Sequence, residues 1–282
     1  MNRRKFISTS VKATMGVGLL SGLYAWQIEP FWLEFVKINM PLKNLPSNLK
    51  GKTIMQISDL HIGNRFDYNY IIDALEEAKN YKPDIVVYTG DYVSYENSQQ
   101  VTQLREVMKH CTKGTLGTYG ILGNHDYGKN WAEQNVGDQI TQVLEDNGIK
   151  ILKNNSVDIG GLTIIGMDDY WGPNFNAKKA LSHFHADNAN IVLCHNPDVC
   201  DLNIWGEYNS WILSGHTHGG QVKAPFLDPF VLPVKNKRYT QGLISLSQNR
   251  TLYINRAIGH LWQVRFNVRP EITLFHLSNA KD

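Results

Sequence analysis

The chain has 282 residues, of which 42% are hydrophobic and 19% are charged, and its formal net charge is +2. This balance excludes a disordered or fibrous protein, and the low charge argues against a protein that coats nucleic acid. Its three cysteines, Cys111, Cys194 and Cys200, are too few for a disulfide framework. Pairing of Cys194 with Cys200 stays open, but buried free thiols are the favoured prediction.

The N-terminal segment combines a basic start at residues 3–5 with an apolar stretch at residues 11–26. This order is typical of an export signal or a signal anchor. Arg3-Arg4 with the apolar pair that follows resembles a twin-arginine export signal. The stretch lacks the amphipathic charge pattern of a helix that packs on a domain, and it has no clear cleavage site. We therefore predict that residues 1–27 are a signal or membrane anchor segment at a bacterial inner membrane.

Residues 28–50 contain three prolines and are predicted to be a linker along the membrane surface. Apolar side chains in this stretch either enter the membrane interface or pack on the domain, and both alternatives stay open. These side chains are Phe31, Trp32, Leu33 and Phe35. Residues 51–280 are then expected to form one domain, because α/β domains reach about 200–250 residues.

From residue 52 onward, short apolar runs alternate with amphipathic segments. Six runs predict strands, at residues 53–57, 84–89, 118–122, 162–167, 190–194 and 211–214. Helical spacing of apolar residues predicts helices at 70–80 and 131–147, with Gly148 as the C-cap of the second. Strands that alternate with helices indicate an α/β fold with parallel strands at its centre.

The C-terminal third lacks long helical patterns. Its apolar runs predict strands at residues 221–222, 252–254, 264–266 and 271–277. We expect these strands to form a second, largely antiparallel sheet that covers the first. The whole domain is therefore predicted to be a sandwich of two sheets flanked by helices.

Side chains of metal-ligand type follow five of the predicted strands directly. The five clusters are Asp59-Leu60-His61, Gly90-Asp91, Gly123-Asn124-His125-Asp126, His195 and Gly215-His216-Thr217-His218. Each cluster alone is weak evidence, and a lone histidine after a strand is usually an ordinary core or surface residue. Because ligands of open α/β sheets bind at the carboxyl ends of the strands, we expect the five clusters to converge.

Together the clusters offer seven oxygen and imidazole ligands and no thiolate. The seven are Asp59, His61, Asp91, Asn124, His195, His216 and His218. Such ligands suit Mn, Fe or Zn, and seven are too many for one tetrahedral zinc but fit two cations that share a carboxylate. Two cations about 3.5–4 Å apart can hold a bridging hydroxide and clamp a phosphate during in-line displacement.

In this order, the motifs resemble the calcineurin-like metallophosphoesterase superfamily, whose pattern is Asp-x-His, Gly-Asp-x-x-Asp, Gly-Asn-His-Asp/Glu, a lone His and Gly-His-x-His. The resemblance covers about residues 52–277 and implies a four-layer α/β/β/α sandwich with two divalent metal ions. It also implies two sets of ligands bridged by Asp91, namely Asp59, His61 and His218 for one metal and Asn124, His195 and His216 for the other.

The resemblance further implies catalytic roles for the residues beside Asn124. His125 would face the phosphate and help the leaving oxygen take a proton, and Asp126 would orient His125. One position departs from the family pattern, because Ser94 replaces the second aspartate of Gly-Asp-x-x-Asp. That aspartate is not a metal ligand in the family, so the departure affects local support rather than the predicted metal site.

The segments 215–221 and 269–273 look like those of a bacterial branch of membrane-associated phosphodiesterases, which includes enzymes that resemble UDP-2,3-diacylglucosamine hydrolases of lipid A synthesis. This likeness implies a metal-dependent phosphoesterase for phosphodiester or pyrophosphate bonds, and a lipid-linked substrate such as UDP-2,3-diacylglucosamine. No nucleic-acid partner is expected. Two alternatives stay open: a binuclear hydrolase of amides or lactones, and a non-catalytic scaffold. The Asn124-His125-Asp126 trio argues against the first, and the retained ligands argue against the second.

Further polar and aromatic residues could line the cleft, although an ordinary surface or core role is expected for each. They are Asn64, Arg65, Asp168, Asp169, Trp171, Trp205, Arg256 and Trp262.

Overall fold

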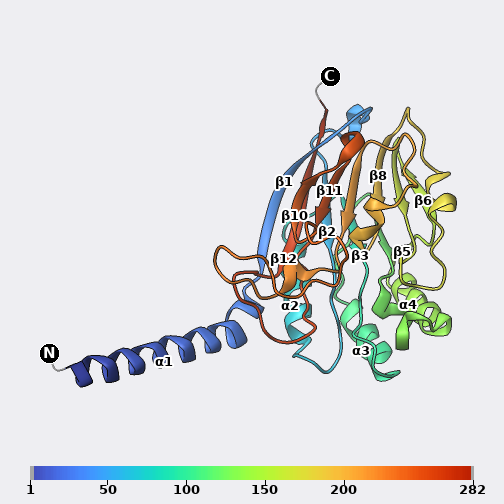
Figure 1. Cartoon of the computed structure of the whole chain (residues 1–282). Helices are drawn as coiled ribbons and strands as arrows, with labels where there is room; N and C mark the ends of the chain where they lie inside the picture. Colours follow the sequence, from blue (N-terminus) through green and yellow to red (C-terminus); the bar gives the residue numbers. More distant parts are fainter. Residues whose placement is uncertain (1–2, 281–282) are drawn as a thin grey trace.

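Two six-stranded sheets pack face to face in the computed structural model, which describes residues 3–280 (Figure 1). In spatial order, the first sheet contains β1 (Glu34–Leu42), β12 (Glu271–Asn279), β2 (Thr53–Ile57), β3 (Ile85–Thr89), β4 (Gly117–Ile121) and β5 (Lys150–Ile151). The second contains β10 (Gly242–Ser245), β11 (Thr251–Ile254), β9 (Trp211–Ser214), β8 (Ala189–Leu193), β7 (Leu162–Gly166) and β6 (Asn155–Ile159).

Helices cover the outer faces of the sandwich unequally. The first sheet carries α2 (Asn69–Lys79), α3 (Gln99–Met108) and α4 (Gln134–Asp146). The second sheet is covered by the short helix α5 (Ala177–Leu181) and by loops. The predicted α/β sandwich is thus confirmed, with a thinner outer layer over the second sheet.

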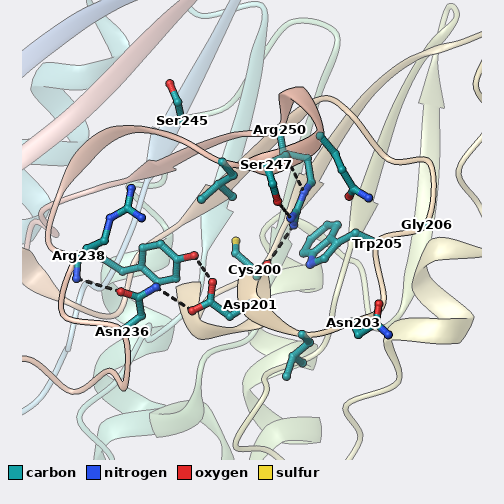
Figure 2. A pocket seen from close by; sticks show the side chains of 14 residues that line it. Cys200, Asp201, Asn203, Trp205, Gly206, Asn236, Arg238, Ser245, Ser247 and Arg250 are labelled. Carbon is teal, nitrogen blue, oxygen red and sulfur yellow. Dashed lines mark hydrogen bonds between the residues drawn. The ribbon is translucent and has the colours of Figure 1, made fainter.

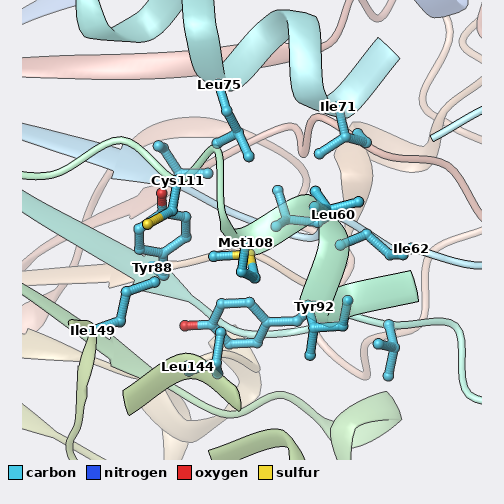
Figure 3. Close-up of a cluster of buried hydrophobic side chains, with 14 of the residues drawn as sticks. Leu60, Ile62, Ile71, Leu75, Tyr88, Tyr92, Met108, Cys111, Leu144 and Ile149 are labelled. Atoms are coloured by element: carbon cyan, nitrogen blue, oxygen red, sulfur yellow. The ribbon is translucent and has the colours of Figure 1, made fainter. Parts of the chain in front are cut away.

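The side-chain alternation of the strands divides the core into layers. In β3, Val86 and Tyr88 pack under the helices, whereas Ile85 and Val87 pack between the two sheets. Figure 3 shows Tyr88 in the first of these layers, among side chains from α2, α3 and α4. Because both faces of the central strands are buried, these strands consist of continuous apolar runs rather than alternating ones.

Most of the predicted elements are present at nearly the predicted positions. The six strand predictions between residues 53 and 214 correspond to β2, β3, β4, β7, β8 and β9. The helix predicted at 131–147 is α4, which begins only at Gln134 because Asn130 and Trp131 have left-handed backbone. Gly148 follows the end of α4 with a φ of 79°, as predicted for a glycine C-cap.

The prediction for the C-terminal third was wrong in its topology. The 271–277 strand is β12, which lies in the first sheet between β1 and β2 rather than in the second sheet. Residues 221–222 and 264–266 form only an isolated bridge between Val222 and Phe266. The second sheet is not largely antiparallel either, because β7, β8, β9 and β11 are parallel neighbours.

The N-terminal region differs from a helix plus a linker. Helix α1 (Arg3–Gln27) projects away from the domain (Figure 1) and is long and apolar enough to span a membrane, as a signal sequence also would be. Residues 28–50, predicted as a linker, contain β1, which pairs with β12 along its whole length. Because Glu34 pairs with Glu271, and the nearby Thr273 pairs with Gln56, α1 leaves the sandwich at the end where β2 terminates.

Other features of the linker prediction are resolved by packing. Phe31 contacts the rings of Tyr70 and His260, and Phe35 stacks on Tyr81. Trp32 remains half exposed.

All three cysteines are buried and free, as predicted.

Candidate metal centre

The five polar clusters meet at one end of the sandwich, where the parallel strands of both sheets terminate. The end of β2 reaches that of β9, because the Gln56 side-chain amide donates to the Ser214 carbonyl at 2.9 Å. The end of β3 reaches that of β8, because His195 Nδ1 donates to the Thr89 carbonyl at 2.8 Å. The predicted convergence of the clusters is therefore present in the structure.

All seven predicted ligands are buried at this end, and each is at most 5% exposed. Three of them, Asp59, His61 and His218, form one group of donor atoms. His61 Nε2 lies 2.9 Å from His218 Nε2 and 3.8 Å from Asp59 Oδ1, and His218 Nε2 lies 3.2 Å from the same Asp59 oxygen. Two imidazole nitrogens and one carboxylate oxygen thus face a common point.

A second group of donor atoms contains Asp91, His195 and His216. His195 Nε2 lies 3.1 Å from Asp91 Oδ2 and 3.2 Å from His216 Nδ1. Asp91 Oδ2 is also only 3.6 Å from His61 Nε2 of the first group. One carboxylate oxygen is therefore within reach of both groups.

Asn124 occupies the loop between these groups and its side chain is buried. Both of its neighbours contact Asp91, since Gly123 packs against it and the His125 amide donates to Asp91 Oδ1 at 2.9 Å. Asn124 Oδ1 has no hydrogen-bond partner. A buried amide oxygen without a partner is costly in a finished core. The unpaired Asn124 oxygen, in the same loop region as the predicted carboxylate and imidazole ligands, is suited to bind a cation.

The backbone at the centre is unusual. Five of the seven predicted ligands are non-glycine residues in the left-handed region, with φ between 48° and 71°: Asp59, His61, Asp91, His216 and His218. Such residues are uncommon, and they cluster at functional sites where the surrounding structure holds them in place. The strain turns each side chain sharply out of its strand end and toward the common centre.

Glycines precede several of these ligands because no other residue would fit. A Cβ on Gly123 would collide with the Asp91 carboxylate and backbone, and one on Gly215 would collide with Asp59 and Ser58. The turns therefore pack backbone directly against the acidic groups, as the motif glycines predicted.

Hydrogen bonds outside the donor groups fix the orientation of the rings. His61 Nδ1 hydrogen-bonds Ser94 Oγ at 3.0 Å, and His216 Nε2 donates to the Pro233 carbonyl at 3.0 Å. With His195 Nδ1 bonded to Thr89, the remaining nitrogen of each of these three rings points into the centre. Ser94 replaces the family's aspartate and supports His61, a role that its position in the motif left undefined.

Burial and neighbouring charges together set the ionisation of the carboxylates. Burial alone would raise the pKa of Asp59, but the charges of His218 and His195 outweigh it and lower the pKa to about 2. Burial alone would raise the pKa of Asp91 as well, but the combined effects of His195, His125 and His61 hold it well below its ordinary value. Burial lowers the pKa of His216 to about 3, and repulsion from His195 adds to the decrease.

The pKa of His195 moves in the opposite direction. Burial would lower this pKa, but Asp91 and Asp59 outweigh burial and raise it well above its ordinary value. A cation and this proton would compete for the same ring nitrogen, so a cation bound at His195 would displace a proton. The ionised carboxylates and the neutral His216 are already in the state that metal ligands need.

The structure gives Asp126 a different role from the one predicted. Its Oδ2 accepts from the amides of Asp91 and Gly123, and its Oδ1 accepts from those of Tyr92 and Val93. Among the described residues, no hydrogen bond joins it to the His125 ring. Its oxygens are occupied by the loop that carries Asp91, so Asp126 positions Asp91 rather than orienting His125.

His125 lies beside the two groups of donor atoms. Its ring packs edge-on against His61 with centroids 5.1 Å apart, and a ring nitrogen lies close to donor atoms of His61 and Asp91. It is only half-buried, unlike the seven predicted ligands. Burial lowers its pKa, and the opposing effect of Asp91 does not compensate. The ring thus stands between the donor groups and solvent.

The further residues that the sequence suggested for the lining of the cleft have different roles in the structure. Arg256 forms ion pairs with Glu271 and Glu34 and therefore serves the sheet rather than a substrate. Trp171 packs edge-on against His216, with centroids 4.6 Å apart, and lies at the wall of the centre. Asp169 accepts from the Trp171 amide, and burial raises its pKa to about 7.

A cavity of about 630 Å³, here called the polar cleft, lies elsewhere on the second sheet (Figure 2). It is larger than the pocket of about 160 Å³ that His216 and His218 line. The lining of the polar cleft includes Cys200, Asp201, Trp205, Asn236, Arg238, Tyr239, Ser247 and Arg250. None of the seven predicted ligands lines it. Cavity size therefore does not locate the chemistry of this protein.

Comparison with known proteins gives a consistent result. Residues 52–220 match the family described as calcineurin-like phosphoesterase. Phosphodiesterase YaeI of Escherichia coli K12 is 28% identical over 98% of this chain and 99% of its own. YkuE of Bacillus subtilis, an uncharacterized metallophosphoesterase, is 28% identical over 99% of each chain. The UDP-2,3-diacylglucosamine pyrophosphatase LpxG of Chlamydia muridarum is 24% identical over 95% of this chain and 96% of its own.

The family match covers more than half of the chain and contains the strand ends that carry Asp59, Asp91, Asn124, His195 and His216. The relatives extend the similarity to nearly the whole length. The chain therefore belongs to the calcineurin-like phosphoesterase family and is a metal-dependent hydrolase of phosphate esters.

Proposed function

We propose that the seven buried side chains hold two divalent cations, and that the enzyme cleaves a phosphodiester or pyrophosphate bond beside them. The observation that carries this proposal is the position of Asp91 Oδ2, 3.1 Å from His195 Nε2 and 3.6 Å from His61 Nε2. Asp91 would bridge the cations, with Asp59, His61 and His218 holding one, and Asn124, His195 and His216 holding the other. The absence of thiolate favours Mn, Fe or Zn bound by oxygen and nitrogen.

Two bound cations would polarise the phosphoryl group and lower the pKa of the attacking water. The chain's own residues would do the rest. His125, half-buried at the open side of the centre, would give a proton to the leaving oxygen. Asp126 holds the Asp91 loop, and Ser94 holds His61, so that the donor atoms are preorganised.

The substrate that we propose is a lipid with a phosphodiester or pyrophosphate in its headgroup. LpxG, which matches this chain along almost its whole length, is named for a pyrophosphate bond in UDP-2,3-diacylglucosamine. The exposed apolar helix α1 supports a lipid-linked substrate, because a tethered enzyme meets its substrate in the membrane plane. UDP-2,3-diacylglucosamine is thus one member of the proposed class.

We propose that residues 1–27 form the membrane anchor and that the catalytic domain begins near residue 28, since β1 belongs to the first sheet. The Arg3-Arg4 pair supports export by the twin-arginine route. Replacing both arginines by lysine and following the protein by cell fractionation tests this route. Unchanged fractionation of the double variant would contradict twin-arginine export.

The function itself is tested with the full chain in detergent, freed of metal and then reloaded with Mn, Fe or Zn. We expect metal-dependent hydrolysis of bis(p-nitrophenyl) phosphate and faster hydrolysis of at least one lipid-linked diester or pyrophosphate, UDP-2,3-diacylglucosamine included. Hydrolysis of amides or lactones without any of phosphodiesters would contradict the proposal. Equal turnover with and without metal would contradict it as well.

A further inference from the structure

An exposed apolar surface lies beside the metal centre and is formed by two segments of the C-terminal third. We call it the apolar lip, and it consists of Phe226, Leu227, Phe230, Val231, Trp262 and Val264. Phe226 is fully exposed, and Phe230 and Trp262 are 77% and 69% exposed. Among the described residues after Trp32, most exposed large apolar side chains fall in this lip. An apolar patch of this kind marks an interaction site.

The apolar lip forms one wall of a pocket whose other wall is the metal centre. The pocket has a volume of about 160 Å³ and is lined by His216 and His218 together with Phe230, Val231 and Trp262. A group that rests on the lip is therefore in contact with the pocket that opens to two predicted ligands. The lip therefore lies directly beside the candidate metal centre.

Hydrogen bonds from neighbouring residues hold the lip segments. The Gln221 side-chain amide donates to the carbonyls of Trp262 at 2.8 Å and Val264 at 2.9 Å, and its oxygen accepts from the Leu261 amide. The Lys237 ammonium donates to the carbonyl of Leu232, at the end of the other segment. The segment with Trp262 and Val264 is thus held in place by the Gln221 side chain.

The lip segment that contains Trp262 and Val264 contacts the end of α1. The Arg265 amide donates to the Ala25 carbonyl at 2.9 Å, and the Gln263 side chain donates to the Trp26 carbonyl at 3.2 Å. Tyr24 packs edge-on against Phe266. These contacts place the lip directly beside the residues at which α1 enters the domain.

Buried charge makes this junction rigid. The Arg265 guanidinium is fully buried and donates to the carbonyls of Arg256, Gly259 and Val268. Gly259 in turn donates its amide to the Asp59 carbonyl at 2.9 Å. A continuous chain of hydrogen bonds, through the Arg265 backbone and side chain, therefore connects the end of α1, the lip and the metal centre.

The occupant that these observations favour is a lipid bilayer. Trp26, Ile28 and Trp32 are each about half exposed and continue the apolar surface from the lip to α1. Aromatic side chains at the base of a spanning helix are typical of the membrane interface. Exposed Lys235, close in sequence to the lip, suits anionic headgroups.

We propose that the apolar lip inserts into the same bilayer that α1 spans, so that the metal centre opens at the membrane surface and a lipid headgroup enters it while its acyl chains stay in the bilayer. This inference rests on the proposed membrane attachment and names how the proposed substrate reaches the centre.

The test uses the full chain with an environment-sensitive fluorophore on Phe230→Cys. The three native cysteines are buried, so the introduced thiol is the reactive one. The matched control is Leu116→Cys, which is exposed and precedes β4 at the opposite end of the sandwich. Both proteins are reconstituted in vesicles of phosphatidylethanolamine and phosphatidylglycerol, with and without doxyl-labelled lipid.

We expect the label at position 230 to shift its emission to shorter wavelength and to be quenched by the doxyl lipid, and the label at position 116 to do neither. Equal behaviour of the two labels would overturn the inference. A shift at 230 without doxyl quenching would overturn it in favour of a protein contact, such as a second copy of this chain.

A second pair of variants distinguishes this inference from the proposed function. Phe226→Ser with Leu227→Ser, two lip residues that do not line the pocket, should leave hydrolysis of soluble bis(p-nitrophenyl) phosphate unchanged but lower turnover of a vesicle-embedded lipid pyrophosphate. Leu116→Ser should change neither. If the wild type hydrolyses no phosphodiester, the proposed function fails whatever the label shows. If the double variant loses nothing on the embedded lipid, only the lip inference fails.

Discussion

The metal centre and the polar cleft both contain many polar side chains, but these side chains find hydrogen-bond partners to different extents. In the polar cleft, Arg250 donates to the Cys200 carbonyl and to Ser247, and Asp201 accepts from Asn236 and Tyr239. None of the described residues that line this cleft has a buried side-chain polar atom without a partner. In the metal centre, Asn124 Oδ1 and His218 Nδ1 have none.

The backbone conformations of the polar cleft and the metal centre also differ. Left-handed residues in the polar cleft are Gly206, which tolerates that conformation, and Gln248 in an exposed turn. At the metal centre, buried aspartates and histidines adopt it instead. The larger cavity is thus a relaxed surface feature, whereas the smaller and strained site holds buried polar atoms that lack hydrogen-bond partners. Backbone strain and buried polar atoms without partners indicate the functional site where cavity size does not.

The largest effect that we expect at the metal centre is from Asp91→Ala. Removal of the oxygen shared by both donor groups should reduce metal-dependent hydrolysis of bis(p-nitrophenyl) phosphate below detection. The matched control is Asp187→Ala, an exposed aspartate outside both regions, which should leave turnover unchanged. Metal-dependent turnover that survives in Asp91→Ala would contradict the shared-ligand assignment.

A smaller loss is expected from His125→Ala. If this ring protonates the leaving oxygen, kcat should fall by about 10²- to 10⁴-fold while bound metal stays constant. The loss should be larger for an alkyl leaving group than for p-nitrophenolate, which needs little protonation. Equal losses for both leaving groups would indicate that His125 only shapes the cleft.

A still smaller loss of metal affinity or activity is expected from Ser94→Ala. Loss of the hydrogen bond to His61 Nδ1 should lower metal affinity or activity by about 10- to 100-fold, the usual effect of a residue that supports a ligand. Ser94→Asp supplies the family's residue and should retain most of the activity. Metal titration of the two variants checks this order, and equal affinity of Ser94→Ala and the wild type would refute it.

The smallest effect on catalysis is expected from Arg250→Ala in the polar cleft. Turnover should be unchanged, whereas the free energy of unfolding should fall by about 1–3 kcal/mol, because the lost guanidinium leaves the Cys200 carbonyl without its donor. Denaturant unfolding and diester hydrolysis of the same preparation measure the two quantities. A selective loss of activity would show that the polar cleft takes part in catalysis.

The convergence of the five clusters was predictable because the information that carries it is local. Each cluster follows an apolar strand, and glycine stands before Asp91, Asn124 and His216. The left-handed backbone at Asp59 and His61 was not predictable, because no residue type in those turns demands it. The contacts of Asp126 and Ser94 were also missed, since they depend on how two loops pack rather than on spacing.

The fold was predictable to the extent that its strands and helices are local patterns. The place of β12 in the first sheet was not, because its pairing with β2 joins residues more than two hundred positions apart. The same reason hid β1, which has no partner near it in the sequence. The apolar lip is a surface of two distant loops, and neither shows a periodic pattern from which it could be inferred.

The most direct test of the central claim is anomalous X-ray diffraction from crystals of the full chain soaked in Mn²⁺. Our account predicts two peaks, one on each side of the Asp91 carboxylate, with Asp59, His61 and His218 around one and Asn124, His195 and His216 around the other. A single peak, or two peaks of which only one contacts Asp91, would contradict it.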